Sequence, residues 1–204
     1  MNRLPITRAL LSVADKTGLV DLARRLHEAG VEIVSSGGTA AALADAGIPV
    51  TTVADVTAAP EMLGGRVKTL HPAIHGGILA DLADDSHRAD LAERGIEAFG
   101  LVVVNLYPFE STVASGAAEA EVIENIYIGG PTLIRAAAKN HAWVATVVSP
   151  ARYDEVVEAI EQGGTTAAMR ADLAREAFFR TARYDAAIVN WLERDGADRL
   201  ALTL

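Results

Sequence analysis

The chain of 204 residues contains no cysteine. This absence excludes disulfide bonds, thiolate nucleophiles and cysteine-based zinc sites together. No apolar run reaches the length of about 18 residues that a membrane-spanning helix needs, so we expect no membrane segment. The stretch from Met1 to Lys16 has no apolar region followed by a small-residue cleavage site, which argues against export. We therefore expect a cytoplasmic protein.

Lysine is also scarce, because the chain has 15 arginines but only three lysines, Lys16, Lys68 and Lys139. A lysine ammonium is compact and can lose its proton when buried, which a guanidinium cannot do. The three lysines of this arginine-rich chain therefore indicate positions where arginine could not do the same task. The alternative is that their positions are due to chance. The net charge of -9 argues against nucleic acid as a partner, since phosphate backbones bind basic faces.

The remaining composition is that of an ordered protein, with 50% hydrophobic and 22% charged residues. Strands alternating with helices predict an α/β fold, a parallel sheet flanked by helices, with right-handed crossovers. We expect a nucleotide-binding domain over residues 1–150 and a C-terminal helical part of the same unit over residues 151–204. Strands are expected at 9–13, 31–35, 48–53, 99–107 and 144–148, and helices at 19–30, before Gly47, at 84–94, from Pro131, at 151–162 and at 165–195.

Residues 64–79 carry the densest group of polar side chains. Two glycines open this segment and Pro72 disfavours a helical conformation at His71, so we expect a loop. The loop presents Arg66, Lys68 and Thr69. Their planar guanidinium, compact ammonium and hydroxyl groups are together suited to binding a cluster of anionic oxygens. A solvated basic turn is the alternative for such a motif.

Two more polar segments follow expected strands, and ligands of parallel sheets bind beyond the carboxyl ends of strands. Residues 36–39 (SGGT) suit a phosphate at a helix N-terminus, with a plain turn as the alternative. Asn105 and Tyr107 close the strand at 99–107, where a core aromatic is the alternative for the tyrosine. His71 and His75 have metal-ligand spacing, but Pro72 is expected to break that helix and no carboxylate completes a set, so we predict no metal site.

Five segments in the same order resemble one family: SVADKTG (12–18), SGGT (36–39), GGRVKTLHPAIHGGIL (64–79), VVNLYPF (103–109) and IGGPTLIRAAAKNH (128–141). Together they resemble the IMP cyclohydrolase domain of the bifunctional enzyme AICAR transformylase/IMP cyclohydrolase. The resemblance implies a methylglyoxal-synthase-like fold, a homodimer, and a ribonucleotide substrate. It implies that 5-formamido-imidazole-4-carboxamide ribotide loses water to form IMP, and it implies no cofactor or metal. The family's transformylase domain is not expected within this chain.

The resemblance also implies roles for individual residues. Residues 14–16 would belong to the nucleotide-binding first loop, residues 36–39 and 66–69 would hold the 5′-phosphate, and the end of the strand at 99–107 would contact the base region. Lys139 would be the proton donor, with Lys68, Tyr107 and position 127 in the catalytic set. The implied substrate contacts are Ala14, Asp15, Lys16, Ser36, Gly37, Gly38, Thr39, Arg66, Lys68, Thr69, Val104, Asn105 and Ile128.

One position departs from the family pattern, because Tyr127 stands where the family has an aspartate before Ile-Gly-Gly. A phenol, with an ordinary pKa near 10, cannot serve as a carboxylate base at neutral pH. Glu124 lies nearby in sequence as a possible substitute. Three hypotheses stay open: an IMP cyclohydrolase, a paralogue acting on another imidazole or purine-like ribotide, and a non-catalytic nucleotide-binding module.

Overall fold

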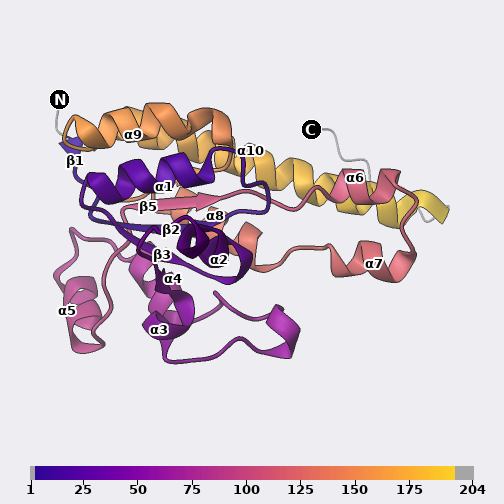
Figure 1. The fold of residues 1–204 in the computed structure, drawn as a ribbon, viewed down its shortest axis with the longest axis horizontal. Coiled ribbons are helices and arrows are strands. Elements are labelled where there is room, and N and C mark those ends of the chain that lie inside the picture. Colours follow the sequence, from indigo (N-terminus) through magenta and orange to yellow (C-terminus); the bar gives the residue numbers. More distant parts are fainter. Residues whose placement is uncertain (1–2, 196–204) are drawn as a thin grey trace.

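The computed structural model describes residues 3–195 and contains a five-stranded sheet whose neighbouring strands all pair in parallel (Figure 1). The strand order is β4-β3-β2-β5-β6, so β2 lies in the centre between β3 and β5. The predicted α/β class with a parallel sheet is confirmed. The five strands are β2 (Arg8–Ser12), β3 (Glu32–Ser35), β4 (Thr51–Thr52), β5 (Leu101–Val104) and β6 (Ala145–Val147).

Helices connect these strands and cover both faces of the sheet. The helices are α1 (Leu19–Glu28), α2 (Gly37–Asp45), α3 (Val53–Thr57), α4 (Pro72–Leu79), α5 (Asp85–Glu93), α6 (Phe109–Ala114), α7 (Glu119–Glu124), α8 (Gly129–Lys139), α9 (Tyr153–Glu161) and α10 (Ala167–Leu192), with short 3₁₀ turns at Leu63–Gly65, Pro150–Arg152 and Glu193–Asp195.

Alternating side chains of the central strands supply two separate hydrophobic clusters, as the period of two in a strand requires. Leu11 and Val103 face a cluster that α1 and α9 close. Leu10 and Val102 face the opposite cluster, which α4, α8 and α10 close. Because the sheet is buried on both faces, its strands are continuous apolar runs.

Local signals explain where the predicted boundaries were wrong. The strand expected at 48–53 is only two residues long, because Thr52 and Asp55 form a reciprocal cap that starts α3 at Val53. Pro72 was expected to keep its segment out of a helix, but it occupies the first turn of α4, where its missing N–H is not needed. The side chain of His71 caps that helix by accepting a hydrogen bond from the backbone N–H of Ala73 at 3.1 Å.

Sequence reasoning missed a second, two-stranded antiparallel pairing between β1 (Arg3–Leu4) and β7 (Thr165–Thr166). It also missed α6 and α7. These two helices lie beside the far half of α10, beyond the end of the sheet (Figure 1). There Phe109, Val122, Tyr184 and Trp191 form a small buried group of their own, which we call the arm cluster. The 26-residue α10 is about 39 Å long, enough to reach from the sheet to this cluster.

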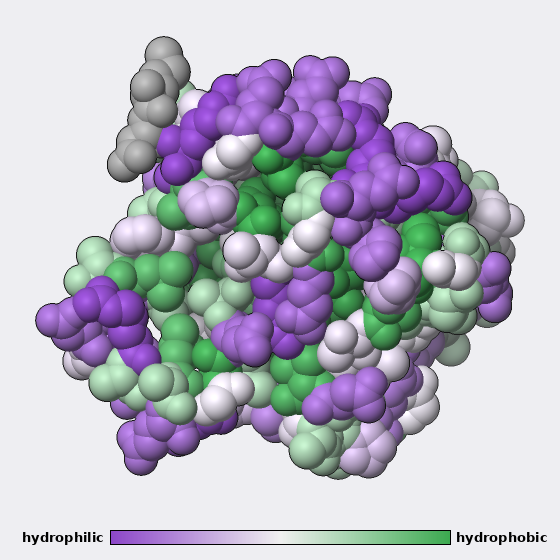
Figure 2. Space-filling model, turned by 60° about the vertical axis from the view of Figure 1, so that its left-hand side comes forward, coloured by the Kyte–Doolittle hydropathy of each residue, from purple (hydrophilic) through white to green (hydrophobic). Residues whose placement is uncertain are grey.

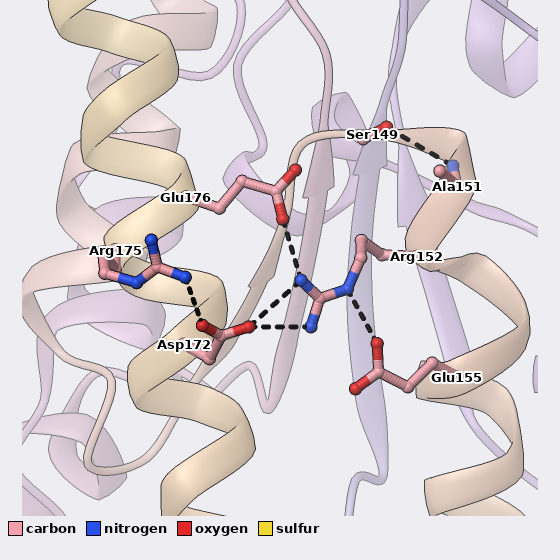
Figure 3. Close-up of polar contacts among 7 residues, drawn as sticks. All are labelled: Ser149, Ala151, Arg152, Glu155, Asp172, Arg175 and Glu176. Atoms are coloured by element: carbon pink, nitrogen blue, oxygen red, sulfur yellow. Dashed lines mark hydrogen bonds and ion pairs between the residues drawn. The ribbon is translucent and has the colours of Figure 1, made fainter.

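An ion-pair network fixes the start of α9 against α10 (Figure 3). The guanidinium of Arg152 lies 2.7 Å from the Glu155 carboxylate, 3.2 Å from that of Asp172 and 3.0 Å from that of Glu176. The next residue, Tyr153, is buried, and burial together with the nearby charge of Asp15 raises its pKa to about 12. The network therefore sets the position of a neutral ring that packs on the loop after β2.

Hydrophilic side chains gather along the upper edge of the face in Figure 2, where α1 and α9 lie in Figure 1. Polar outer surfaces on these helices match the apolar surfaces that they turn toward the sheet. No helix in residues 3–195 combines the length and apolar character that crossing a membrane requires.

Two adjacent glycines of α4 provide a test of this packing. A Cβ atom at Gly77 would lie 2.6 Å from the backbone oxygen of Glu97 and 3.0 Å from the Phe99 ring, whereas one at Gly76 would meet its nearest neighbour at 3.5 Å. We expect Gly77→Ala to lower the free energy of unfolding by about 1–3 kcal/mol through overpacking. Gly76→Ala should be neutral or raise it by up to about 1 kcal/mol. Urea denaturation of both variants checks this, and equal effects would contradict it.

Candidate functional site

Three loops that follow parallel strands meet at one edge of the sheet, the carboxyl edge. They follow β2, β3 and β5, and residues 61–71 and 125–130 lie against them. Parallel pairing places strand ends of this kind together, and such edges are where ligands of α/β sheets bind. The described polar side chains of this edge form the candidate site.

The first turn of α2 carries exposed backbone donors. Gly37 and Gly38 are solvent-exposed, and the N-cap Ser36 makes no capping hydrogen bond with its side chain. The first N–H groups of a helix have no partner within the helix, and the helix dipole adds positive potential there. Gly37 adopts a φ of 54°, a conformation that glycine tolerates better than other residues. A turn with these features is suited to binding an anion.

Two of the three lysines converge on this turn. A Cβ atom at Gly37 would lie 3.0 Å from the Nζ of Lys68, and one at Gly38 would lie 3.8 Å from the Nζ of Lys16. The two ammonium groups come from segments 52 residues apart in the chain, so the fold has brought them together. We call this group, the turn at Gly37–Gly38 with both lysines, the anion cradle.

The hydroxyl of Thr39 is committed elsewhere. It accepts a hydrogen bond from the backbone N–H of Val13 at 3.0 Å and donates its hydrogen to the Val13 oxygen at 3.1 Å. Thr39 is 4% exposed, so it ties α2 to the end of β2 from inside the protein. A hydroxyl with its one hydrogen used in this way has none to offer a phosphate.

Asn105 holds the loop after β2 in place. Its Oδ1 accepts hydrogen bonds from the backbone N–H groups of Ala14 (2.6 Å) and Asp15 (3.0 Å), and its Nδ2 donates to the Asp15 oxygen at 2.8 Å. The Asp15 carboxylate in turn accepts hydrogen bonds from Thr17, which lower the pKa of Asp15. The amide of Asn105 therefore shapes the loop that carries Lys16.

Each of the two cationic side chains of the central loop, Arg66 and Lys68, is paired with a carboxylate. The Nζ of Lys68 lies 3.3 Å from the Glu61 carboxylate. The Nε of Arg66 donates to the Glu124 carboxylate at 3.0 Å, and this hydrogen bond lowers the pKa of Glu124. Glu124, the last residue of α7, is thus the ion-pair partner of Arg66. The structure brings Lys68 to the anion cradle and holds Arg66 on Glu124.

Thr69 and Val104 line the inner wall of the edge. Thr69 is 4% exposed, and its Oγ1 would lie 3.1 Å from a Cβ atom at Gly129, the first residue of α8. Val104 is completely buried in the cluster beneath α8, so only its backbone faces the edge. Ile128, the residue before α8, is more than half exposed.

Tyr127 lies among these residues. Its hydroxyl oxygen is 3.4 Å from the Ser12 Oγ at the end of β2, and its ring meets that of Tyr107 edge-on, with 4.7 Å between centroids. A Cβ atom at Gly130 would lie 2.2 Å from the ring, so this glycine makes room for the tyrosine. Burial raises the pKa of Tyr127, and therefore its phenol is neutral at neutral pH and able to donate a hydrogen bond.

Lys139 lies at the other end of α8. It is ten residues beyond Gly129, which corresponds to about 15 Å along a helix. The next residue, Asn140, donates to the backbone oxygens of Ile78 and Ala80 at the end of α4. The structure therefore does not bring Lys139 of the same chain to the carboxyl edge.

Residues 3–195 hold no group of three His, Asp, Glu or Cys side chains arranged to bind a metal ion. His75 is half-buried in α4, and burial lowers its pKa, which favours the neutral ring. The residues that sequence reasoning missed are Ser12, Glu61 and Tyr184. Ser12 opens the SVADKTG segment, which was the available signal. No local pattern marks the other two, because their partners lie elsewhere in the fold.

Comparison with known proteins gives two family matches. The MGS-like domain model matches residues 18–132, and the AICARFT/IMPCHase bienzyme model matches residues 137–203. The first match covers more than half of the chain, including the Gly37–Gly38 turn and Lys68 of the anion cradle but not Lys16.

Several curated proteins are similar to nearly the whole chain. The bifunctional purine biosynthesis protein PurH of Mycobacterium marinum is 59% identical over 191 residues, which are 94% of this chain and 36% of that protein. PurH of Parvibaculum lavamentivorans is also 59% identical, over 91% of this chain and 35% of that protein. The chain thus spans about a third of the length of these relatives. Among solved structures, the crystal structure of ForH matches with a TM-score of 0.81 and 35% identity, covering 92% of this chain and 99% of that one.

The anion cradle predicts binding of inorganic phosphate. We expect Lys68→Met to weaken phosphate binding about 10- to 100-fold, because a charge-assisted hydrogen bond is lost. Arg88→Met removes an equal charge from the exposed surface of α5, where Arg88 pairs with Asp85, and should leave the affinity unchanged. Isothermal titration calorimetry measures both. An equal loss in the two variants would mean that net charge, rather than the cradle, holds the anion.

Proposed function

The chain belongs to the MGS-like domain family, and on that premise we propose that it is an IMP cyclohydrolase of purine biosynthesis. Its substrate would be 5-formamido-imidazole-4-carboxamide ribotide, and its product IMP. The observation that carries the proposal is the convergence of Lys16 and Lys68 on the exposed turn of α2, in a chain 59% identical to PurH proteins. A ribotide needs such a cradle for its 5′-phosphate.

The phosphate contacts follow from the free donors of the cradle. Backbone N–H groups of Gly37, Gly38 and Thr39 would bind phosphate oxygens, with the two ammonium groups at the sides. This replaces the expected contact of the Thr39 hydroxyl, which Val13 occupies. Ser36 keeps a free hydroxyl at the same turn. Phosphate binding would displace Glu61 from Lys68.

The reaction closes a ring within one molecule. The carboxamide nitrogen attacks the formyl carbon, a C–N bond forms, the nitrogen loses a proton and the formyl oxygen gains one. A nitrogen then releases a second proton, and the hydroxyl group takes this proton and leaves as water. A C=N bond forms and completes the purine. Holding the two groups in register provides much of the rate, since well-oriented intramolecular reactions reach effective molarities of about 10⁵ M or more.

Tyr107 and Tyr127 are the groups placed to act on the formyl oxygen. Their rings are in contact beside Ser12, and Tyr127 is held neutral by burial. A neutral phenol donates a hydrogen bond to a developing oxyanion, which is the task that this step requires. It does not accept the amide proton as the family's aspartate would. We therefore expect slower chemistry than in the family pattern.

Lys139 stays our proposed proton donor, and we propose that it acts from a second copy. A distance of about 15 Å along α8 separates it from the site in its own chain. In a two-fold homodimer each copy offers the same surface to the other, so an exposed lysine of one can complete the site of the other.

Further parts of the proposal follow the family. We place the protein in the cytoplasm and expect no metal or cofactor. Residues 1–150 and 151–204 would form one cyclohydrolase unit. The helix α10 supports that unity, because it contributes Leu173 to the cluster that α9 closes and Ala174 to the cluster on the opposite face of the sheet.

A second candidate function rests on Tyr127 alone. Its ring fills space at the edge that an aspartate would leave open, and Gly130 accommodates it. A pocket reshaped in this way suits another imidazole or purine-like ribotide that binds through the same cradle. A non-catalytic nucleotide binder is the remaining outcome, in which neither ribotide is converted.

The test of the first candidate is IMP formation from the formamido ribotide, followed by ultraviolet absorbance. We expect turnover by the wild type. Tyr127→Asp should raise kcat by about tenfold or more, because a carboxylate can accept the amide proton. Tyr127→Phe is the matched control, since it keeps the ring, removes only the hydroxyl, and should lower kcat.

A wild type that binds IMP without forming it would reject the first candidate. If Tyr127→Asp then gains no activity and loses affinity for IMP, the reshaped pocket of the second candidate is favoured.

The proposed role of Lys139 predicts complementation between inactive variants. Lys139→Met and Lys68→Met should each lose most of their turnover. A mixed dimer of the two has one site with both lysines intact, so random mixing should restore about a quarter of wild-type activity. Activity that stays at the level of the separate variants would rule out a shared site. Full activity of Lys139→Met would remove this residue from the mechanism.

A further inference from the structure

The arm cluster is joined to the candidate site by one buried polar side chain. The cluster lies between α6, α7 and the far half of α10, away from the sheet (Figure 1). Three of its four buried members contribute apolar or ring surface to the cluster: Phe109, Val122 and Trp191. Tyr184 is 8% exposed and packs edge-on against Phe109, with 6.0 Å between ring centroids.

The hydroxyl of Tyr184 makes two hydrogen bonds to the segment that precedes α8. It accepts the backbone N–H of Tyr127 at 2.8 Å and donates to the backbone oxygen of Asn125 at 3.1 Å. These bonds bridge the residues on either side of Ile126. A single hydroxyl therefore fixes the path of the chain where it enters the site, 57 residues away in sequence.

The backbone of Tyr127 determines where its phenol lies. Gly130 leaves the ring one place to pack, and Tyr107 closes its other side. With the N–H held by Tyr184, the hydroxyl oxygen comes to 3.4 Å from the Ser12 Oγ. If that anchor is lost, the Tyr127 N–H loses its described partner, and we expect the ring to shift relative to Ser12.

We propose that Tyr184 is a positioning residue, which sets the Tyr127 phenol at the site from the arm. This inference rests on the proposed function for its effect on turnover, but the geometry on which it depends does not. Tyr184 does not reach the substrate, and its hydroxyl acts through the backbone of Tyr127. The arm cluster thereby influences the geometry of the site, although Tyr184 does not line it.

The test compares two variants that each remove a buried oxygen from α10. Tyr184→Phe keeps the ring and its contact with Phe109 but removes both hydrogen bonds. Thr181→Val, one turn earlier, removes a fully buried hydroxyl whose only described hydrogen bond is to the Phe178 oxygen within α10. Thermal unfolding of both variants shows how far each is destabilised.

We expect Tyr184→Phe to lower kcat for IMP formation about 10- to 100-fold, because a small displacement of a reacting group has effects of this size. The KM and the affinity for inorganic phosphate should stay unchanged, since the anion cradle does not touch Tyr184. Thr181→Val should leave kcat unchanged even where its loss of stability is equal. Equal kcat values for Tyr184→Phe and the wild type would overturn the proposal.

A second readout does not depend on the reaction. Tyrosine labelled with ¹³C at Cζ reports each of the four phenols by NMR, and the spectrum of Tyr127→Phe identifies the Tyr127 signal. Burial raises the Tyr127 pKa, so a displaced and more exposed ring in Tyr184→Phe should titrate nearer the ordinary value. An unchanged titration would overturn the positioning role. If the wild type forms no IMP, the proposed function fails while this measurement still decides the inference.

Discussion

Parallel pairing of β2 with both β3 and β5 is the constraint on which the site depends. It forces three strand ends to one edge, and each end releases a loop with a different task. The loop after β2 carries Lys16, the turn after β3 exposes backbone donors, and the end of β5 supplies Asn105, which clamps the first of these loops. An antiparallel strand at any of these positions would send its loop to the opposite edge.

Much of this arrangement can be predicted from sequence, because apolar runs and glycine turns are local signals. The α/β class and the position of the turn at residues 36–39 beyond a strand end follow from residue types and spacing. Thr39 and Asn105 show the limit, since a hydroxyl or an amide serves a ligand or the backbone equally well. Only the fold shows that Val13 and the loop at Ala14–Asp15 occupy them. Lys139 shows the same limit for distance, because a motif does not reveal which end of a helix faces the site.

Charge at the candidate site differs from what a carboxylate at position 127 would create. The neutral phenol of Tyr127 provides no negative charge to balance the ammonium groups of Lys16 and Lys68. Glu61 and Glu124 instead supply negative charge from the central loop and α7, on groups that an arriving phosphate can displace. In the proposed function, the site would bind the phosphate by exchanging these carboxylates for it, and Tyr127 would not act as a base.

The arm cluster has a consequence for cooperativity. It has four buried side chains, far fewer than either cluster on the sheet, so we expect the arm to open locally at a lower free-energy cost than the sheet. Because Tyr184 belongs to this unit and holds Tyr127, each opening of the arm also releases the phenol from the site. With Tyr184 in the proposed positioning role, the phenol would be in place only while the arm is closed, whereas the sheet that carries the anion cradle could stay closed throughout.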